Sequence, residues 1–248
     1  MTSANSAFSV KVFTLFPELF PGVLGASVTG RALDQGLWDL EAINLRDFAH
    51  GKHRQVDDTP CGGGAGMVMR PDVIHDALTS CYKDQKPKRL IYLSPRGMPF
   101  SQKLAQEFAH DGEIGLLCGR FEGVDQRVLD AWDVEEVSLG DFVLSGGEIA
   151  AQALIDASVR LVPGVLGASE SLEEESFASG LLEYPHYTRP REWNDCNVPQ
   201  VLLSGNHREI YAWRKEQAES LTKARRPDLW QRYLAKDPNN VKLKNKSE

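Results

Sequence analysis

Cysteines are scarce in this sequence, and none of them stands in a known pairing pattern. The four cysteines, Cys61, Cys81, Cys118 and Cys196, are widely spaced, with no Cys-x-x-Cys pair and no histidine at zinc-finger spacing. Such spacing favours neither a disulfide framework nor a structural zinc site. A Ser/His/Asp constellation and a cluster of metal-ligand residues are missing as well, so the sequence predicts no metal ligands.

Long apolar runs are also absent. No stretch approaches the roughly 20 apolar residues that are needed to span a bilayer, and residues 1–6 lack the basic and apolar blocks of a signal peptide. Low-complexity tracts and repeats at solenoid spacing are missing too. We therefore expect a cytoplasmic, globular protein with no membrane partner, whose 248 residues suffice for one large or two modest domains.

Positive charge is in deficit overall, but it is unevenly distributed. The net charge of −7 argues against a protein that holds nucleic acid by bulk electrostatics, because such binding depends on Lys and Arg that meet phosphates. Residues 180–248 nevertheless contain 13 Lys and Arg against 9 Asp and Glu, which leaves 15 against 26 in residues 1–179. The chain thus combines an acidic body with a mildly basic C-terminal part.

Strand-like and helix-like segments alternate along the first two thirds of the chain. Alternation of apolar and polar residues predicts a strand over residues 10–15, and a short apolar run stopped by Pro95 predicts another over 89–94. Strand character is also found over residues 38–44, 114–118, 135–139 and 142–144. Helical spacing of apolar residues predicts helices over 23–33, 71–81, 101–110, 124–132 and 148–161. Strands that alternate with helices in this way predict an α/β core with a parallel sheet covered on both faces.

Three other segments differ from this pattern. Residues 46–70 are rich in charge and glycine and are predicted to form a long loop, which is usually functional or disordered at that length. After Pro163-Gly164, the acidic stretch 170–175 is predicted to be a mobile linker. Residues 201–234 are predicted to form two or three helices in a small separate unit.

Three glycine-bearing turns follow three of the predicted strands, at residues 93–97, 118–123 and 144–147. Ligands of open α/β sheets bind at the carboxyl ends of the strands, where glycine lets the backbone approach a ligand. Each glycine taken singly could merely satisfy turn geometry, but together the turns favour one ligand pocket. None matches Gly-x-Gly-x-x-Gly or the P-loop pattern, so neither standard nucleotide fingerprint is supported.

Several other candidate residues have plain structural explanations. The loop at residues 62–66 could form a backbone nest for anions or be a flexible surface loop. Arg160 ends a predicted helix, where a cation favours the helix dipole. The run at residues 173–175 is typical of a solvated face. His186 and His207 are expected to be structural rather than catalytic.

Nine blocks of sequence, in order over nearly the whole chain, resemble one known family, the bacterial tRNA (guanine-37-N1)-methyltransferases of the SPOUT class, TrmD type. These blocks are Leu15-Phe-Pro-Glu18, Val28-Thr-Gly-Arg31, Val56-Asp-Asp58 with Gly62-Gly-Gly64, Tyr92-Leu-Ser-Pro95, Leu117-Cys-Gly-Arg-Phe-Glu-Gly-Val-Asp125, Ser138-Leu-Gly-Asp-Phe-Val-Leu-Ser-Gly-Gly-Glu148, Pro163-Gly-Val-Leu-Gly167, Pro185-His-Tyr-Thr-Arg-Pro190 and Leu202-Leu-Ser-Gly-Asn-His207.

The resemblance implies a fold that periodicity alone does not give. The α/β domain would span residues 1–164, with a deep trefoil knot at about 90–161, although knots are rare among folds. A flexible linker, 165–178, would lead to a small helical tRNA-binding domain, 179–248. The family is also homodimeric, with each site completed by the partner chain.

The resemblance further implies the cofactor S-adenosylmethionine, whose pocket the three glycine-bearing turns would form. The residues that match the family's cofactor site are Tyr92, Leu93, Ser94, Pro95, Gly97, Gly119, Glu122, Leu139, Leu144, Gly146 and Gly147. A requirement for Mg²⁺ is implied by the resemblance alone.

The implied chemistry is methyl transfer to N1 of guanine 37, next to the anticodon of a tRNA. This N1 carries a proton, so the reaction needs a base and a cation that stabilises charge on O6. Glu175, which precedes Ser176-Phe177, and Arg160 match the positions of the family's base and cation. Glu175 stands where the family usually has Asp, so its carboxyl lies one methylene further out, and Glu174 is the alternative base.

Two regions match the family's tRNA-reading parts. Asp57, Asp58, Gly62, Gly63 and Gly64 match the region that reads the target guanine, and Ser204, Asn206 and His207 match the part that grips the anticodon stem. Two alternatives stay open: a SPOUT methyltransferase that modifies another RNA base or a ribose hydroxyl, and an RNA-binding module without catalysis. Methylation assays on tRNA transcripts separate the three.

Overall fold

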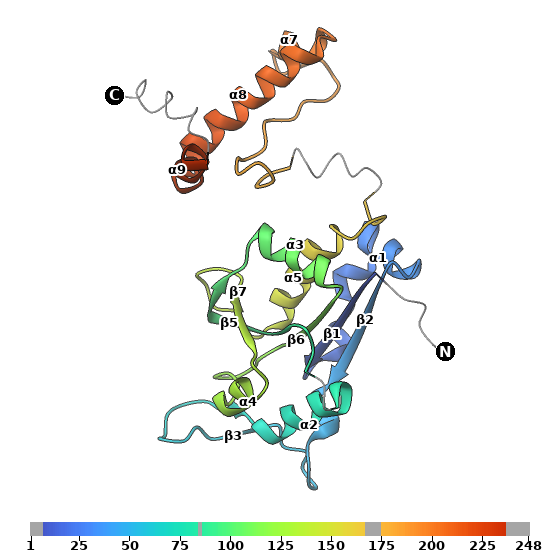
Figure 1. The fold of residues 1–248 in the computed structure, drawn as a ribbon, viewed down its shortest axis with the longest axis vertical. Coiled ribbons are helices and arrows are strands. Elements are labelled where there is room, and N and C mark those ends of the chain that lie inside the picture. Colours follow the sequence, from blue (N-terminus) through green and yellow to red (C-terminus); the bar gives the residue numbers. More distant parts are fainter. Residues whose placement is uncertain (1–6, 84–85, 167–174, 237–248) are drawn as a thin grey trace. The chain divides into compact units, whose positions relative to one another are not determined.

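The computed structural model describes residues 7–83, 86–166 and 175–236. The chain divides into two compact units, residues 1–167 and residues 168–248 (Figure 1). The domain bounds and the linker expected over residues 165–178 stay predictions. Residues 167–174, which include most of the acidic stretch and the alternative base Glu174, lie outside the described residues.

A five-stranded sheet forms the centre of the first unit, and every neighbouring pair of its strands is parallel. The strands follow the order β2-β1-β6-β5-β7 across the sheet. Their bounds are β1 (Phe8–Thr14), β2 (Trp38–Asn44), β5 (Leu90–Pro99), β6 (Glu113–Leu117) and β7 (Glu135–Ser138). The α/β class and the parallel sheet predicted from the alternation of elements are therefore confirmed, whereas the knot stays a prediction.

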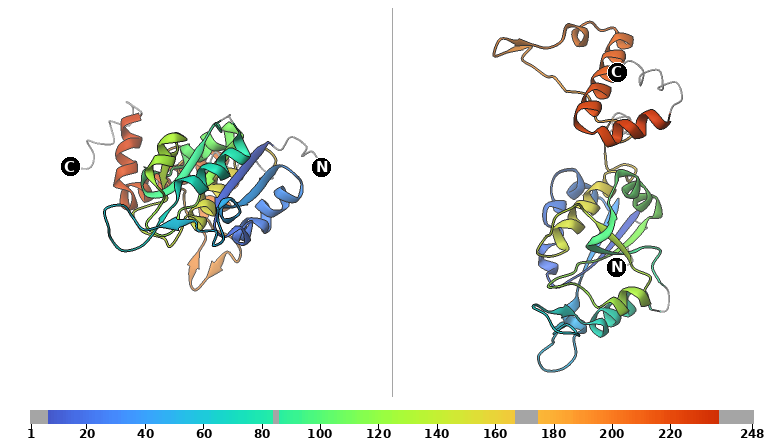
Figure 2. Two further views of the ribbon diagram at one scale, coloured as in Figure 1. Left: turned by 90° about the horizontal axis from the view of Figure 1, so that it is seen from below. Right: turned by 90° about the vertical axis from the view of Figure 1, so that its left-hand side faces the viewer.

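Helices cover both faces of this sheet, as the sequence predicts (Figure 2). Successive side chains of a strand point to opposite faces. Ile91 of β5 therefore joins one apolar core with Phe108, whereas Leu90 joins a second core with Leu78. The helices of this unit are α1 (Ser27–Asp34), α2 (Pro71–Tyr82), α3 (Gln102–Asp111), α4 (Gln126–Ala131) and α5 (Glu148–Val159).

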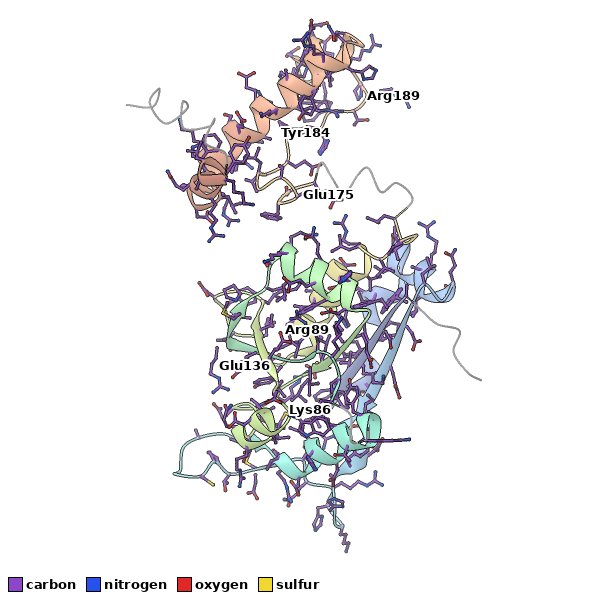
Figure 3. All side chains as sticks on the ribbon, in the orientation of Figure 1. Lys86, Arg89, Glu136, Glu175, Tyr184 and Arg189 are labelled. Atoms are coloured by element: carbon purple, nitrogen blue, oxygen red, sulfur yellow. The ribbon has the colours of Figure 1, made fainter. Side chains whose placement is uncertain are left out.

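One cluster of ion pairs fixes the start of β5 to its neighbours. Arg89, labelled in Figure 3, donates to Asp111 at 2.9 Å and to Glu135 at 2.8 Å, and it pairs with Glu107 at 3.2 Å. Its guanidinium thereby links the C-terminal turn of α3 to the first residue of β7. This cluster lies at the opposite end of β5 from the predicted glycine turn.

The strand predicted over residues 142–144 is absent. Phe142 and Val143 are 52% and 84% exposed and pair with no strand. Their apolar side chains imitate a strand pattern, but they lie at the surface, where no neighbouring strand edge satisfies their backbone.

The predicted stop of β5 at Pro95 is also wrong, because the strand continues to Pro99. Leu93 and Met98 both lie opposite Val137 of β7, with an irregularity between them. A bulge of this kind leaves residues outside the ladder. Pro95, which lacks a backbone N–H, therefore leaves no ladder hydrogen bond unmade.

Two further segments contain more structure than expected. The single helix predicted over residues 23–33 is divided into a short 3₁₀ helix, η2 (Gly22–Gly25), and α1, which begins at Ser27 with a positive φ of 54°. The long loop over residues 46–70 starts within the 3₁₀ helix η3 (Leu45–Phe48) and includes the two-residue strands β3 (Asp57–Asp58) and β4 (Val68–Met69). Another 3₁₀ helix, η1 (Pro17–Leu19), follows β1.

The described part of the second unit contains the expected helices over residues 201–234 and one unpredicted hairpin. The helices are α7 (Gln200–Leu203), α8 (His207–Arg225) and α9 (Pro227–Lys236), and the hairpin pairs β8 (Glu192–Trp193) with β9 (Cys196–Asn197). Thr222 of α8 is fully buried and accepts a hydrogen bond from the amide of Leu182 at 2.8 Å. In the part of the chain that the structure describes, every helix is too short or too polar to cross a membrane.

Candidate active site

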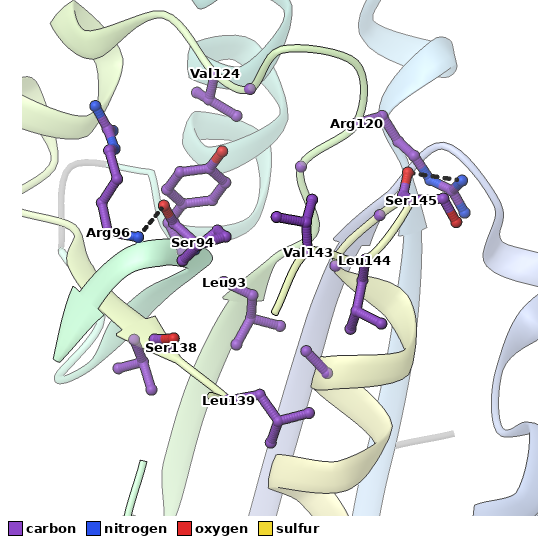
Figure 4. Close-up of a pocket in the computed structure, with 18 of the residues that line it drawn as sticks. Leu93, Ser94, Arg96, Arg120, Val124, Ser138, Leu139, Val143, Leu144 and Ser145 are labelled. Atoms are coloured by element: carbon purple, nitrogen blue, oxygen red, sulfur yellow. Dashed lines mark hydrogen bonds between the residues drawn. The ribbon is translucent and has the colours of Figure 1, made fainter. Parts of the chain in front are cut away.

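A pocket of about 370 Å³ opens beside β5, β6 and β7 (Figure 4). Three chain segments form its walls, which we name the first wall (residues 92–96), the second wall (119–124) and the third wall (137–147). Ala150 of α5 completes the lining. The three glycine-bearing turns, which are far apart in the sequence, thus meet at one site, as expected for the carboxyl ends of parallel strands.

Ten of the eleven residues that match the family's cofactor site line this pocket. They are Tyr92, Leu93, Ser94, Pro95, Gly119, Glu122, Leu139, Leu144, Gly146 and Gly147. Gly97 is not in the lining, because it packs against β7, where a Cβ would lie 2.3 Å from the backbone nitrogen of Val137. That these residues bind a cofactor stays a prediction.

Close packing, rather than turn geometry, explains Gly119 of the second wall and Gly147 at the end of the third wall. A Cβ on Gly119 would lie 2.7 Å from the Tyr92 ring, and one on Gly147 would lie 2.8 Å from the Cα of Cys118. Real Cβ atoms do not approach other atoms so closely, and neither glycine has a positive φ. A side chain at either position would therefore push two walls of the pocket apart.

The first wall carries a buried phenol. Burial raises the pKa of Tyr92 above its ordinary value, so its hydroxyl stays protonated through the neutral range. The neighbouring Ser94 accepts a hydrogen bond from the amide of Arg96 at 3.2 Å. Tyr92 and Ser94 therefore give this wall two neutral hydrogen-bonding side chains.

Several pocket residues were missed by sequence reasoning. They are Arg96, Arg120, Phe121, Gly123, Val124, Val137, Ser138, Gly140, Phe142, Val143, Ser145 and Ala150. Most stand inside or beside the sequence blocks quoted above, so their position in a recognised block was the available signal. Ser138 shows the limit of that signal, because its hydroxyl donates to the carbonyl of Gly140 at 3.1 Å, a contact that only the folded turn reveals.

The glycine loop of residues 61–67 lies beside the second wall. The amide of Glu122 donates to the carbonyl of Met67 at 2.9 Å, and a Cβ on Gly66 would lie 2.4 Å from a carboxylate oxygen of Glu122. Gly62, Gly63 and Gly64 have φ values of +93°, +82° and +124°. The loop is thus anchored to the pocket at one end, while those three exposed glycines project from it.

Asp57 and Asp58 lie at the other end of this loop. They form β3, opposite Met69 and Val68 of β4. Asp58 is exposed and accepts a hydrogen bond from the amide of Thr59 at 2.8 Å. The short ladder therefore closes the loop at its base, and a role of these carboxylates in reading guanine stays a prediction.

The two predicted catalytic residues belong to different units. Arg160 follows the last turn of α5, and its amide donates to the carbonyl of Asp156 at 3.3 Å. Glu175, labelled in Figure 3, begins the described part of the second unit, where its carbonyl accepts from the amide of Ala178 at 3.2 Å. Their catalytic roles stay predictions.

Ser204 and Asn206 have structural roles between α7 and α8. The side chain of Asn206 caps α8 by accepting from the amides of Arg208 at 3.2 Å and Glu209 at 3.4 Å. The Ser204 hydroxyl donates to the carbonyl of Val201 at 2.8 Å and accepts from the Asn206 amide at 3.1 Å. Both residues thus build a capped turn, which presents the exposed His207 at the start of α8.

His186 has a local partner as well. Its Nε2 lies 2.9 Å from Glu183, and its ring lies 5.0 Å from that of Tyr184. Among residues 7–83, 86–166 and 175–236, no group of three or more His, Cys, Asp and Glu side chains is placed so that it could hold a metal ion.

The chain is similar to a known protein family and to named proteins of that family. The sequence model of a family described as tRNA (Guanine-1)-methyltransferase TrmD matches residues 8–232. A protein of Cereibacter sphaeroides strain ATCC 17023 is 60% identical over 242 residues, which cover 95% of this chain and 97% of that protein. A protein of Ruegeria pomeroyi is 58% identical, covering 93% and 96%. A protein of Rhodospirillum rubrum is 57% identical, covering 90% and 93%.

All three relatives are named tRNA (guanine-N(1)-)-methyltransferase. The match extends through both units and includes every wall of the pocket. The chain therefore belongs to the tRNA (guanine-1)-methyltransferase TrmD family.

Proposed function

We propose that this protein transfers a methyl group from S-adenosylmethionine to N1 of guanine 37 in tRNA. One observation carries the proposal: ten residues singled out as a cofactor site line a single pocket in a chain that matches the family over residues 8–232. The names of its relatives support the base and the atom that are methylated.

The pocket fits the cofactor in size and chemistry. Its volume of about 370 Å³ is within the range of small-molecule sites. The amide of Gly147 donates to the carbonyl of Gly119 at 3.0 Å, so these two glycines join the second and third walls around the ligand. Glu122 offers a carboxylate to the positively charged end of the cofactor. When bound there, S-adenosylmethionine supplies a methyl group that its sulfonium has already activated.

The chain's own residues supply what guanine lacks as a nucleophile. Glu175 takes the proton from N1, and Arg160 stabilises the negative charge that then develops on O6. The lone pair freed on N1 would form the new bond to the methyl carbon while the bond from that carbon to the sulfonium sulfur breaks, which leaves neutral S-adenosylhomocysteine. Positioning accelerates such an in-line displacement. We assign no step to Mg²⁺, since the described residues offer no ligand cluster for it.

RNA recognition is divided between the two units. The glycine loop, which is anchored to Glu122, and the neighbouring Asp57 and Asp58 read the flipped-out guanine on its Watson–Crick edge. The turn at Ser204–His207 and the basic residues of α8 hold the anticodon stem. This division matches the acidic body and basic C-terminal part of the sequence.

The protein acts as a homodimer whose sites combine both chains, with a trefoil knot over residues 90–161. Support comes from Phe142 and Val143 of the third wall and from Ile149 in the first turn of α5, which are 52%, 84% and 62% exposed. Adjacent exposed apolar side chains are typical of protein interfaces. Mixing Arg160→Ala chains with Glu122→Ala chains should restore activity that neither variant has alone, and failure to do so in verified heterodimers would contradict shared sites.

Radiolabelled methyl transfer tests the proposed reaction directly. A tRNA with guanine 37 should be labelled, and the same tRNA with adenine 37 should not. Label at another base or at a ribose would favour the alternative SPOUT activity. Binding of tRNA without any label in the presence of S-adenosylmethionine would favour a non-catalytic RNA-binding module.

A further inference from the structure

A buried carboxylate lies directly behind the pocket and takes no part in the proposed reaction. Glu148, the first residue of α5, is only 2% exposed. Its Oε1 accepts a hydrogen bond from the hydroxyl of Thr14 at 2.8 Å, and its Oε2 lies 2.9 Å from Nη2 of Arg120. The three residues belong to β1, the second wall and α5, which are far apart in the sequence.

The guanidinium of Arg120 contacts three different segments of the chain. Nε donates to Oε1 of Glu148 at 3.3 Å, and Nη1 donates to the carbonyl of Ser145 at 3.3 Å, as drawn in Figure 4. The guanidinium carbon lies 4.3 Å from the centre of the Phe16 ring. One side chain of the second wall thus holds the third wall, the start of α5 and the segment after β1.

The charge of Glu148 makes this arrangement difficult to relax. A carboxylate at 2% exposure has lost its hydration, which is costly unless a cation compensates it. The rigid, planar guanidinium presents its donors in fixed directions, so pairing with Glu148 also fixes the direction toward Ser145. The guanidinium is therefore held where the two walls meet.

The third wall is shaped to receive this guanidinium. A Cβ on Gly146 would lie 2.3 Å from Nε of Arg120 and 2.6 Å from Oε2 of Glu148. Only glycine leaves room for the ion pair at that point. The conformation of the third wall and the position of the guanidinium thus depend on each other.

We propose that Arg120 is a positioning residue, which holds the second and third walls at the separation that S-adenosylmethionine requires. It acts through Glu148 and the Ser145 carbonyl rather than by contact with the reacting atoms. This inference rests on the proposed function, since it takes S-adenosylmethionine as the occupant of the pocket.

The double variant Arg120→Met with Glu148→Gln tests the role without leaving a buried charge unpaired. Met keeps most of the volume against Phe16, and Gln keeps the hydrogen bond with Thr14. Isothermal titration with S-adenosylhomocysteine, without RNA, should show a Kd raised about tenfold or more, the range for lost hydrogen bonds to charged groups. The rate of single-turnover methylation at saturating cofactor should change less than about threefold. The lost contacts stabilise the bound cofactor equally before and in the transition state, so their loss weakens binding without slowing the chemical step.

Arg120→Lys and Arg127→Gln are the matched variants. Lys keeps the charge but lacks the planar fork, so its Kd should fall between those of the wild type and the double variant. Arg127 is exposed and pairs only locally with Asp125 at 2.7 Å, so Arg127→Gln should bind like the wild type. Should the double variant fail to fold by circular dichroism, Glu148→Gln alone provides the same test.

Two results would overturn the inference. A folded variant with an unchanged Kd would show that the ion pair does not position the walls. A variant whose saturated rate falls as much as its affinity would show that Arg120 contacts the reacting groups. If the wild type itself binds no S-adenosylhomocysteine, the proposed cofactor is wrong, which this experiment distinguishes from failure of the positioning role.

Discussion

The candidate residues of the pocket are held by close packing, whereas those of the second unit lie on elements with few buried side chains. The pocket walls come from segments that are locked to a buried sheet, and an added Cβ at Gly119 or Gly147 would collide with neighbouring atoms. In the described part of the second unit, the buried side chains are few, namely Leu181, Ala218, Thr222 and Leu234. On the proposed function, the cofactor pocket therefore needs only the fold of the first unit, whereas the proposed base, Glu175, belongs to the second unit.

Glu175→Gln should have the largest effect, and it should change the reaction rate but not the binding of the cofactor. Loss of the base should lower the single-turnover rate by about a hundredfold or more, the usual range for a general base, while the Kd for S-adenosylmethionine stays the same. Rapid-quench kinetics and calorimetry measure the two effects. Glu175→Asp should stay active, and Glu174→Gln should have a mild effect. Near-native rates for Glu175→Gln at saturating tRNA across the pH range would make the assignment wrong.

Gly147→Ala should instead weaken the binding of the cofactor. Its Cβ would meet the backbone of Cys118, and overpacking of this kind costs about 1 to 3 kcal/mol. We therefore expect a Kd for S-adenosylmethionine raised about tenfold or more, measured by calorimetry without RNA. Gly25→Ala is the control, because Gly25 is not in the pocket lining and its Cβ would come no closer than 3.1 Å, to the ring of Pro21. Equal effects of the two changes would contradict a pocket formed by close packing.

Thr222→Val examines how firmly the second unit is held. The change preserves shape but removes the acceptor for the partly buried amide of Leu182, which should lower the free energy of unfolding by about 1 kcal/mol. Urea unfolding followed by tryptophan fluorescence measures it, and hydrogen exchange at Leu182 should accelerate. Thr79→Val, at an exposed site of α2, serves as the control. An unchanged midpoint would mean that this contact contributes nothing.

The smallest effect is expected at the junction of α8 and α9. Hydrogen bonds from Arg226 lower the pKa of Asp228 to about 2. A folded-state pKa below the unfolded value means that the pair stabilises the fold above about pH 4 and that this contribution is lost as the pH falls toward 2. Carbon-detected NMR titration should give that midpoint, and Arg226→Gln should return it to the ordinary range. A normal midpoint in the unmodified protein would contradict the pairing.

Elements with a strong local signal could be predicted from the sequence. Apolar and polar residues alternate in β1 and β2, and β6 is a short, mostly apolar segment, so the positions of these strands followed from pattern alone. The same reasoning grouped the three glycine turns, since parallel strands bring their carboxyl ends together. Phe142 and Val143 show where this reasoning fails, because surface apolar residues have the same pattern as a strand.

Contacts between distant residues could not be predicted in this way. Thr14 and Glu148 are 134 positions apart, and nothing near either residue indicates the other. The β8–β9 hairpin was missed for a different reason, because two residues per strand are too few for an alternating pattern. The catalytic roles proposed for Glu175 and Arg160 rest on family resemblance, since an acidic run and a helix end each have an ordinary structural explanation.

The strand order of the sheet has a consequence for synthesis on the ribosome. β1 emerges first and pairs with β2, but its other neighbour is β6. The second edge of β1 therefore stays unpaired until β6 is synthesised, since Ser9 lies opposite Glu113. Pairing over such sequence separations requires closure of a long loop and slows folding. The third wall and α5 emerge later still, so the nascent chain should acquire affinity for S-adenosylmethionine only after nearly the whole first unit has been translated.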